Sequence, residues 1–215
     1  MKKNTLLLMF LLSVITADVQ AQEWWAQDFY SNEDNCCTDE TNFYAKLLAG
    51  ANFLQNTTID KNKSTYQAGY LIGGSLGYCW CYGLRIEAEY AYRRNAINKI
   101  DLFGADSSKH GHYQDSSYMA NLLWDLPLPS LECASGNIRS FVGAGAGYDF
   151  QQMHASNSRV VFNQKWNQFS WQIIAGLQYP IFSNTDLTLE YKFHQGGTHF
   201  YNHFVGMGLV YKREF

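Results

Sequence analysis

Charged side chains recur at every second position in several segments of this chain. In one segment, Arg85, Glu87, Glu89 and Arg93 alternate with mostly apolar residues. Because successive side chains of a β-strand point to opposite faces, this spacing places both signs of charge on one face. Charges enclosed in a medium of low dielectric constant attract each other strongly. We therefore predict an ion-pair network of Lys46, Arg85, Glu87, Glu89, Arg93, Arg139, Glu190, Lys192, Lys212 and Glu214, with Asp125, Asp149 and Asp186 on the same faces.

Histidine is the second residue type with chemistry to offer, as a metal ligand or as a group that titrates near neutral pH. All six histidines, including His154, fall in predicted connections or at strand ends. Their spacings match no recognised ligand motif. The sequence thus predicts no metal site and no cofactor, and the residues available to an ion would be His110, His112, His194, His199 and His203.

The elements that carry these residues are strands, because apolar and polar residues alternate over eight segments of the chain. The aromatic fraction is 16% and Pro is rare, which is typical of β-rich proteins. The sequence therefore predicts an all-β protein with strands at 43–54, 66–78, 84–93, 118–126, 138–150, 169–179, 187–193 and 204–215.

The apolar faces of these segments have the composition of a surface in contact with lipid. Arg213 is the one charged residue on them, and aromatic residues mark both ends of the apolar band that they form together. A bilayer selects two such aromatic girdles, one at each interface. We therefore predict an eight-stranded antiparallel up-and-down transmembrane β-barrel in contact with membrane lipid. An interior of this size is filled by side chains, so the ion pairs are expected to plug it.

The predicted connections alternate in length. Short ones lie at 79–83, 127–137 and 180–186, and longer ones at 55–65, 94–116, 151–167 and 194–203. In outer-membrane barrels the short turns are periplasmic and the long loops are external, so both ends of the chain are expected in the periplasm.

Five cysteines fall on the predicted periplasmic side, where disulfides are stable. The number is odd, so at least one thiol is left over. We favour local disulfides between Cys79 or Cys81 and Cys133 over a bridge to a periplasmic partner protein. The full set of disulfide candidates is Cys36, Cys37, Cys79, Cys81 and Cys133.

The first residues have the pattern of a secretory signal peptide. Lys2 and Lys3 precede a ten-residue apolar run, and Ala21 ends a short small-residue motif. The predicted organisation is a signal peptide at 1–21, an acidic periplasmic segment at 22–42 and the barrel at 43–215. Without residues 1–21 the formal net charge changes from −3 to −4, which does not suggest a nucleic-acid partner.

The final strand resembles the C-terminal signature that the barrel-assembly machinery recognises in bacterial outer-membrane proteins, with Tyr211 and Phe215 as its aromatic positions. The body resembles the small OmpA-like and opacity-protein-like surface antigens of Gram-negative bacteria, in the segments "FVGAGAGYDF", "WQIIAGLQYPI", "LTLEYKF" and "VGMGLVYKREF". The resemblance implies an integral protein of the outer membrane. It specifies the architecture more closely than any activity.

The function expected from these features is that of a non-enzymatic surface protein. Its barrel would anchor four external loops that support the envelope or contact a host cell or receptor. One alternative is a narrow porin-like channel. Another is an enzyme that modifies lipid A with a His and a Ser near the external rim. No Ser lies two residues after His194, His199 or His203, which weakens the match to that enzyme.

Overall fold

The computed structural model describes the chain between residues 43 and 212. Within this range it describes the backbone except at 56, 60–61, 81–82, 103–104, 108–109, 134–135, 158–159 and 198–199. Side chains are described throughout, apart from those within 56–65, 98–110, 127–137 and 155–164. Glu214, Phe215 and Arg213, together with the predicted signal peptide and acidic segment, lie outside the described residues.

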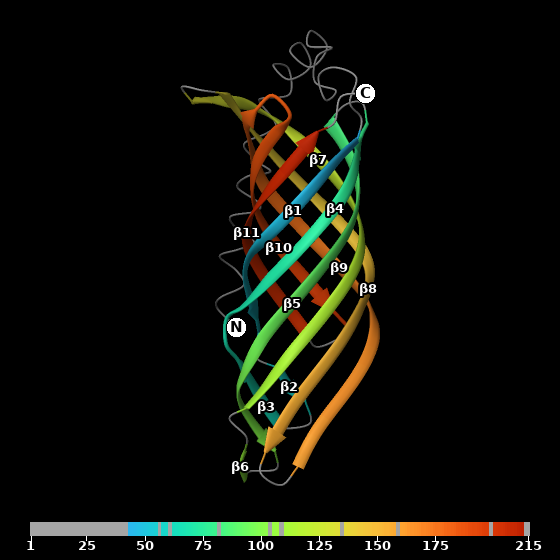
Figure 1. Ribbon diagram of the computed structural model, residues 1–215, viewed down its shortest axis with the longest axis vertical. Helices are drawn as coiled ribbons and strands as arrows, with labels where there is room; N and C mark the ends of the chain where they lie inside the picture. The colour runs from blue at the N-terminus through green and yellow to red at the C-terminus, as the bar shows by residue number, and fades with distance from the viewer. Residues whose placement is uncertain are drawn as a thin grey trace, which may run out of the picture. The chain divides into compact units, whose positions relative to one another are not determined.

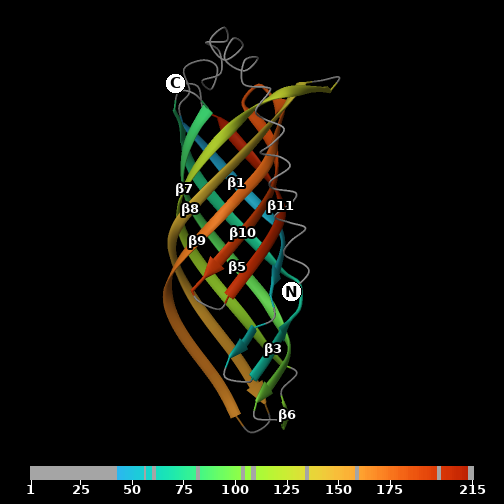
Figure 2. The same cartoon turned by 180° about the vertical axis from the view of Figure 1, so that it is seen from behind.

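Eight long strands form a closed antiparallel barrel (Figures 1 and 2), which confirms the predicted fold class. Each strand pairs with the next along the chain, and the first pairs with the last, with Tyr44 opposite Lys212. Three short strands extend the sheet: β2 (Thr57–Ile59), β3 (Asn62–Tyr66) and β6 (Ala105–Ser107). The wall strands are β1 (Phe43–Leu54), β4 (Gly69–Cys79), β5 (Leu84–Leu102), β7 (His110–Cys133), β8 (Gly136–Asn157), β9 (Val160–Phe182), β10 (Thr185–Gly196) and β11 (Phe200–Lys212).

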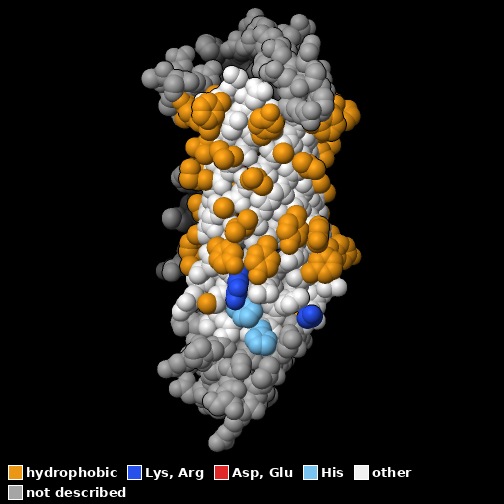
Figure 3. All heavy atoms as spheres, in the orientation of Figure 1, with side chains coloured by type: hydrophobic (Ala, Val, Ile, Leu, Met, Phe, Trp, Pro, Cys, Tyr) orange, Lys and Arg blue, Asp and Glu red, His pale blue; other side chains and the backbone are white. Residues whose placement is uncertain are grey.

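The alternation in the sequence becomes the division between the outside and the inside of the wall. In β1, Leu47 is 71% exposed, whereas its neighbour Lys46 is 3% exposed. In β5, likewise, Ile86 is exposed and Glu87 is buried. Apolar side chains thus lie outside and charged ones inside, which is the reverse of their arrangement in a water-soluble protein. Figure 3 shows apolar side chains spread over the wall, with cationic and histidine side chains beyond one edge of this band.

The two ends of the barrel differ in their connections. At the end where β1 begins and β11 ends, which we call the short-turn end, tight turns join β4 to β5 and β9 to β10. Gly83 in the first of these turns has φ of 72°, a backbone conformation that favours glycine. At the opposite end, which we call the long-hairpin end, β5, β7, β8 and β9 continue beyond the ends of the other long strands (Figure 1).

The predicted long connections were wrong in extent, because strands occupy most of them. β8 runs to Asn157 and β9 starts at Val160, so residues 151–167 form a paired hairpin, as do most of 94–116 and 194–203. Residues 55–65 contain the β2–β3 hairpin, and 127–137 continue β7 and β8 after a register shift between Leu126 and Leu131. An antiparallel ladder does not need an apolar face in order to extend, since water solvates both of its faces beyond the membrane. No helix in the described part of the chain is long and apolar enough to cross a bilayer.

The exposed apolar face predicts a depth-dependent response to charge. Leu47 lies midway between Phe43 and Phe53, the aromatic residues at the two ends of β1. Leu47→Arg should lower the free energy of unfolding from lipid vesicles by about 2–4 kcal/mol, the cost of a cation at the bilayer midplane. Asn167→Arg, an exposed position next to the aromatic Phe169, should cost about 0–1 kcal/mol. Equal losses in urea titrations would contradict a lipid-facing wall.

Candidate functional site

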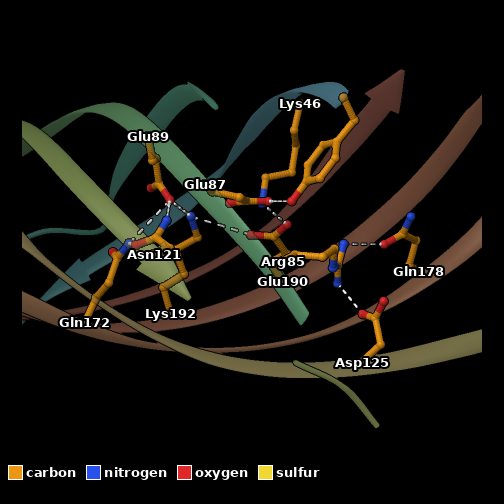
Figure 4. Close-up of polar contacts among 11 residues, drawn as sticks. Lys46, Arg85, Glu87, Glu89, Asn121, Asp125, Gln172, Gln178, Glu190 and Lys192 are labelled. Carbon is orange, nitrogen blue, oxygen red and sulfur yellow. Dashed lines mark hydrogen bonds and ion pairs between the residues drawn. The ribbon is translucent and has the colours of Figure 1, made fainter. Parts of the chain in front are cut away.

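In the described part of the chain the strands gather charged side chains in the barrel interior, and the centre of this interior is a lysine–glutamate network (Figure 4). Lys46 Nζ lies 3.0 Å from Glu87 Oε2 and 2.9 Å from Glu190 Oε1. Lys192 Nζ lies 2.7 Å from Glu89 Oε2 and 3.5 Å from Glu190 Oε2. These residues come from β1, β5 and β10, so the network crosses the interior from wall to wall.

Neutral side chains add hydrogen bonds to this central network. The Tyr44 hydroxyl donates to Glu87 Oε1 at 2.7 Å. Asn121 Nδ2 donates to Glu89 Oε2 at 2.7 Å, and Gln172 Nε2 donates to Asn121 Oδ1 at 2.8 Å. Buried carboxylates are costly unless they are paired and hydrogen-bonded, and here both conditions are met for Glu87 and Glu89.

A second group of charges fills the interior toward the short-turn end. Arg85 pairs with Asp125 at 2.5 Å, donates to Gln178 Oε1 at 3.0 Å and lies over the ring of Phe141. Asp186 forms a further pair of contacts, with Arg139 Nη2 at 2.8 Å and with Lys212 Nζ at 2.7 Å. The Arg85–Asp125 and Lys212–Asp186 pairs join neighbouring strands of the wall, the Arg139–Asp186 pair spans from β8 to β10, and the Arg85–Gln178 hydrogen bond crosses the interior from β5 to β9.

A third group lies toward the long-hairpin end and consists of Arg93, Asp115, Asp149 and His194. Arg93 Nη1 lies 3.1 Å from Asp115 Oδ2 and donates to Ser117 Oγ at 2.7 Å. His194 Nε2 lies 2.8 Å from Asp149 Oδ2 and 4.0 Å from Asp115 Oδ2. All four of these side chains are at most 1% exposed.

An aromatic cluster covers this third group. Leu54, Tyr113 and Phe200 are buried together, with Trp166 packed against them. The rings of Tyr113 and Phe200 stack with centroids 5.2 Å apart, and Trp166 stacks on Phe200 at 5.9 Å. We call these four residues the aromatic cap. The ionic interior is therefore separated from the long-hairpin end by apolar packing.

Every described member of the predicted ion-pair set lies on an inward face and takes part in an ion pair. Asp115 belongs to the same set and was missed, because its segment was interpreted as a loop. Continuing the two-residue period upstream from Asn121 through Met119 and Ser117 would have found it. The described interior holds six basic and seven acidic side chains: Lys46, Arg85, Arg93, Arg139, Lys192 and Lys212 against Glu87, Glu89, Asp115, Asp125, Asp149, Asp186 and Glu190.

The described histidines do not form one cluster. The placement of His194 in an external connection was wrong, because it lies in β10 and faces the interior. His112 and His154 face each other across β7 and β8 on the outer surface, with ring centroids 5.5 Å apart. His203 hydrogen-bonds with Tyr191 and Gln55. The side chains of His110 and His199 lie outside the described residues.

The remaining predicted residues lie at the short-turn end or beyond the described chain. Cys79 ends β4, is buried and is disulfide-bonded. Cys133 ends β7 in the β7–β8 hairpin, and its side chain is not among those described. Cys36, Cys37 and Cys81 lie outside the described residues, so the pairing stays a prediction. Tyr211 lies exposed at the end of β11.

Comparisons with known proteins agree with this architecture. A family model described as an outer membrane protein beta-barrel domain matches residues 7–212. A protein described as an outer membrane protein, from Gluconacetobacter diazotrophicus, is 29% identical over 171 residues, which cover 69% of this chain and 45% of the relative. The chain thus spans less than half the length of that relative.

Two solved structures have a similar fold. Neisserial surface protein A (NspA) has a TM-score of 0.54 and 15% identity, over 80% of this chain and 97% of NspA. The outer membrane protein OprG from Pseudomonas aeruginosa has a TM-score of 0.51 and 10% identity, over 81% of this chain and 99% of OprG. At these identities the similarity shows the fold alone.

The central network predicts a large penalty for removing its shared cation. Lys192→Met leaves Glu89 and Glu190 without the ammonium group between them. Breaking a buried ion pair from one side costs about 3–5 kcal/mol, so the free energy of unfolding in urea should fall by that amount. Lys165→Met, at an exposed position of β9, should stay within about 0.5 kcal/mol of the parent protein. A loss of that small size for Lys192→Met would show that water solvates the interior charges.

Proposed function

Because this chain belongs to the outer membrane protein beta-barrel family and is an eight-stranded barrel of the bacterial outer membrane, we propose that it acts as a non-enzymatic surface protein. In this proposal the barrel is an anchor, and its long hairpins make the contacts that matter to the cell. These contacts are with the surrounding envelope, a host cell or an external receptor. The membrane lipid and the barrel-assembly machinery are its other partners, the latter through the terminal strand that carries Tyr211 and Phe215.

The observation that carries the proposal is the packing of the interior. Arg93, Lys192, Tyr113 and Phe204 are among the largest side chains of the structure, and each is less than 2% exposed. Ion pairs in three groups fill the interior along its length, and the aromatic cap covers one end of them. Barrels of eight strands leave an interior just wide enough for side chains. A packed interior of this kind supports an anchor over a conducting pore.

The wall and the interior are both accounted for by stability, which leaves the long hairpins as the part free to carry function. They extend β5, β7, β8 and β9 beyond the apolar band. In this family of folds the longer connections face the outside of the cell and the short turns face the periplasm. We therefore propose that the long-hairpin end is external and that both chain ends lie on the periplasmic side.

The proposed orientation predicts which connections are reachable on living cells. An epitope inserted between residues 158 and 159, where β8 meets β9, should bind antibody on intact cells. The same epitope in the turn between Ser183 and Asn184 should bind only after the outer membrane is permeabilised. Both insertions lie in connections, so the ladder of the wall is left intact. The reverse labelling pattern would place the long-hairpin end in the periplasm and overturn the proposal.

The role of the hairpins is tested by shortening one of them. Gln152 and Lys165 are paired neighbours in β8 and β9, so replacing residues 153–164 by Asn-Gly should close the hairpin with a tight turn. We expect this variant to insert and to keep its heat-modifiable gel mobility, because the wall is unchanged. Its adhesion to host cells, or its contribution to envelope integrity, should fall severalfold.

Two other experimental outcomes would favour a different function for the protein. Steady unitary currents from the purified full-length protein in planar bilayers would support a narrow channel. A change in the mass spectrum of lipid A on expression would support an enzyme. We expect neither, and we expect the shortened variant and the parent protein to give the same result in both measurements.

A further inference from the structure

The third interior group, toward the long-hairpin end, holds more negative than positive charge. Arg93 is its single permanent cation and pairs with Asp115, whereas Asp149 pairs with His194. Buried carboxylates need a cation or several donors to compensate for the loss of water. Arg93 Nη1 contacts Asp115, while Asp149 lies 2.8 Å from His194 Nε2 and 3.4 Å from Gln151 Nε2 and also interacts with the Ser170 hydroxyl. The group therefore places two carboxylates against one permanent cation.

The geometry of this group brings three ligand atoms to one point. One oxygen each of Asp115 and Asp149 and one ring nitrogen of His194 all lie within 4.8 Å of one another. They come from β7, β8 and β10, so three strands of the closed wall hold them in place. Bonds from a zinc ion to carboxylate oxygen and to imidazole nitrogen are about 2.0–2.2 Å long, so a small inward shift of the side chains would let one ion touch all three.

Buried polar atoms without a described hydrogen-bond partner occur in several parts of the interior, and three of them lie at this group. Asp115 Oδ1 and Asp149 Oδ1 are completely buried and have no hydrogen-bond partner among the described residues, and the same is true of the Tyr113 hydroxyl. Buried polar atoms are nearly always satisfied, and exceptions call for an explanation such as an ion. A proton on His194 Nε2 would serve Asp149 at 2.8 Å but not Asp115, whose Oδ2 is 4.0 Å away. An ion between the three groups would serve both carboxylates.

We propose that Asp115, Asp149 and His194 bind a divalent transition-metal ion of the zinc class inside the barrel. A mixed set of imidazole and carboxylate ligands suits zinc and its neighbours better than calcium or magnesium, which prefer oxygen alone. Arg93 and Gln151 hold the two carboxylates from outside the site, which is the usual part played by residues behind the ligands. The aromatic cap keeps bulk water from the ion, so binding occurs as the barrel folds.

The experiment measures zinc retained by the full chain. The parent protein and the His194→Gln variant are each refolded into detergent with zinc and then dialysed. Plasma mass spectrometry should find one more zinc ion per chain in the parent protein than in the variant. Asp149→Asn should weaken zinc binding at least tenfold. His154→Gln is the matched control, because His154 lies on the outer face of β8, and it should retain as much zinc as the parent protein.

Two further measurements keep the result decisive if a variant folds poorly. Heat-modifiable gel mobility shows whether each variant forms a barrel, and Asp149→Glu preserves a carboxylate and should keep the zinc. Cobalt added in place of zinc to the parent protein should give visible absorption bands that zinc then removes. Equal zinc in the parent protein and in a folded His194→Gln variant would overturn the proposal, as would calcium binding without zinc binding or the absence of both.

Discussion

The whole structure depends on one constraint, which is that a bilayer offers no hydrogen-bond partner to the backbone. Every N–H and C=O group within the membrane must pair inside the protein, and a sheet can achieve this only by closing on itself. The pairing of β1 with β11, from Tyr44 opposite Lys212 to Leu54 opposite Asn202, closes this barrel. Closure also fixes the faces of each strand. The apolar face contacts the lipid, so the polar face must point into the barrel interior.

The interior is consequently built from polar groups in a space too narrow to hydrate them freely. Lysine and glutamate from opposite walls neutralise one another there, as Lys192 and Glu89 do, arginine and aspartate pair mainly between neighbouring strands, and amides such as Asn121 and Gln172 add hydrogen bonds. Small residues make the space for them. A Cβ atom on Gly77 would lie 2.1 Å from the ring of Tyr44, and one on Gly145 would lie 2.0 Å from Asn121 Oδ1. Glycine therefore stands at positions of the wall where a neighbouring strand places a large polar side chain in the interior.

The sequence was sufficient for the architecture because the bilayer imposes a local pattern. Leu84 to Arg93 alternate without a break, so β5 and the direction of its charges could be predicted residue by residue, and the family resemblance based on such segments is confirmed. The alternating pattern did not predict which charged side chains pair with one another. Lys192 meets Glu89 across 103 positions of the chain, and that meeting is set by the register of eight strands together. His194 and Asp115 were misplaced because the apolar face, the only signal used for strand ends, stops before the strands do.

Because the strands extend beyond the apolar band, residues in the two regions are under different constraints. Within the band each side chain contacts either lipid or the packed interior. Both surroundings restrict which residue types can stand at a position. Beyond the band the ladder of β8 and β9 continues with both faces free of that demand. His112 and His154, which face each other on the outer surface there, are not required by the wall, whereas His194 is enclosed by it. Substitutions in the hairpins can therefore accumulate without disturbing the ion pairs that hold the barrel together.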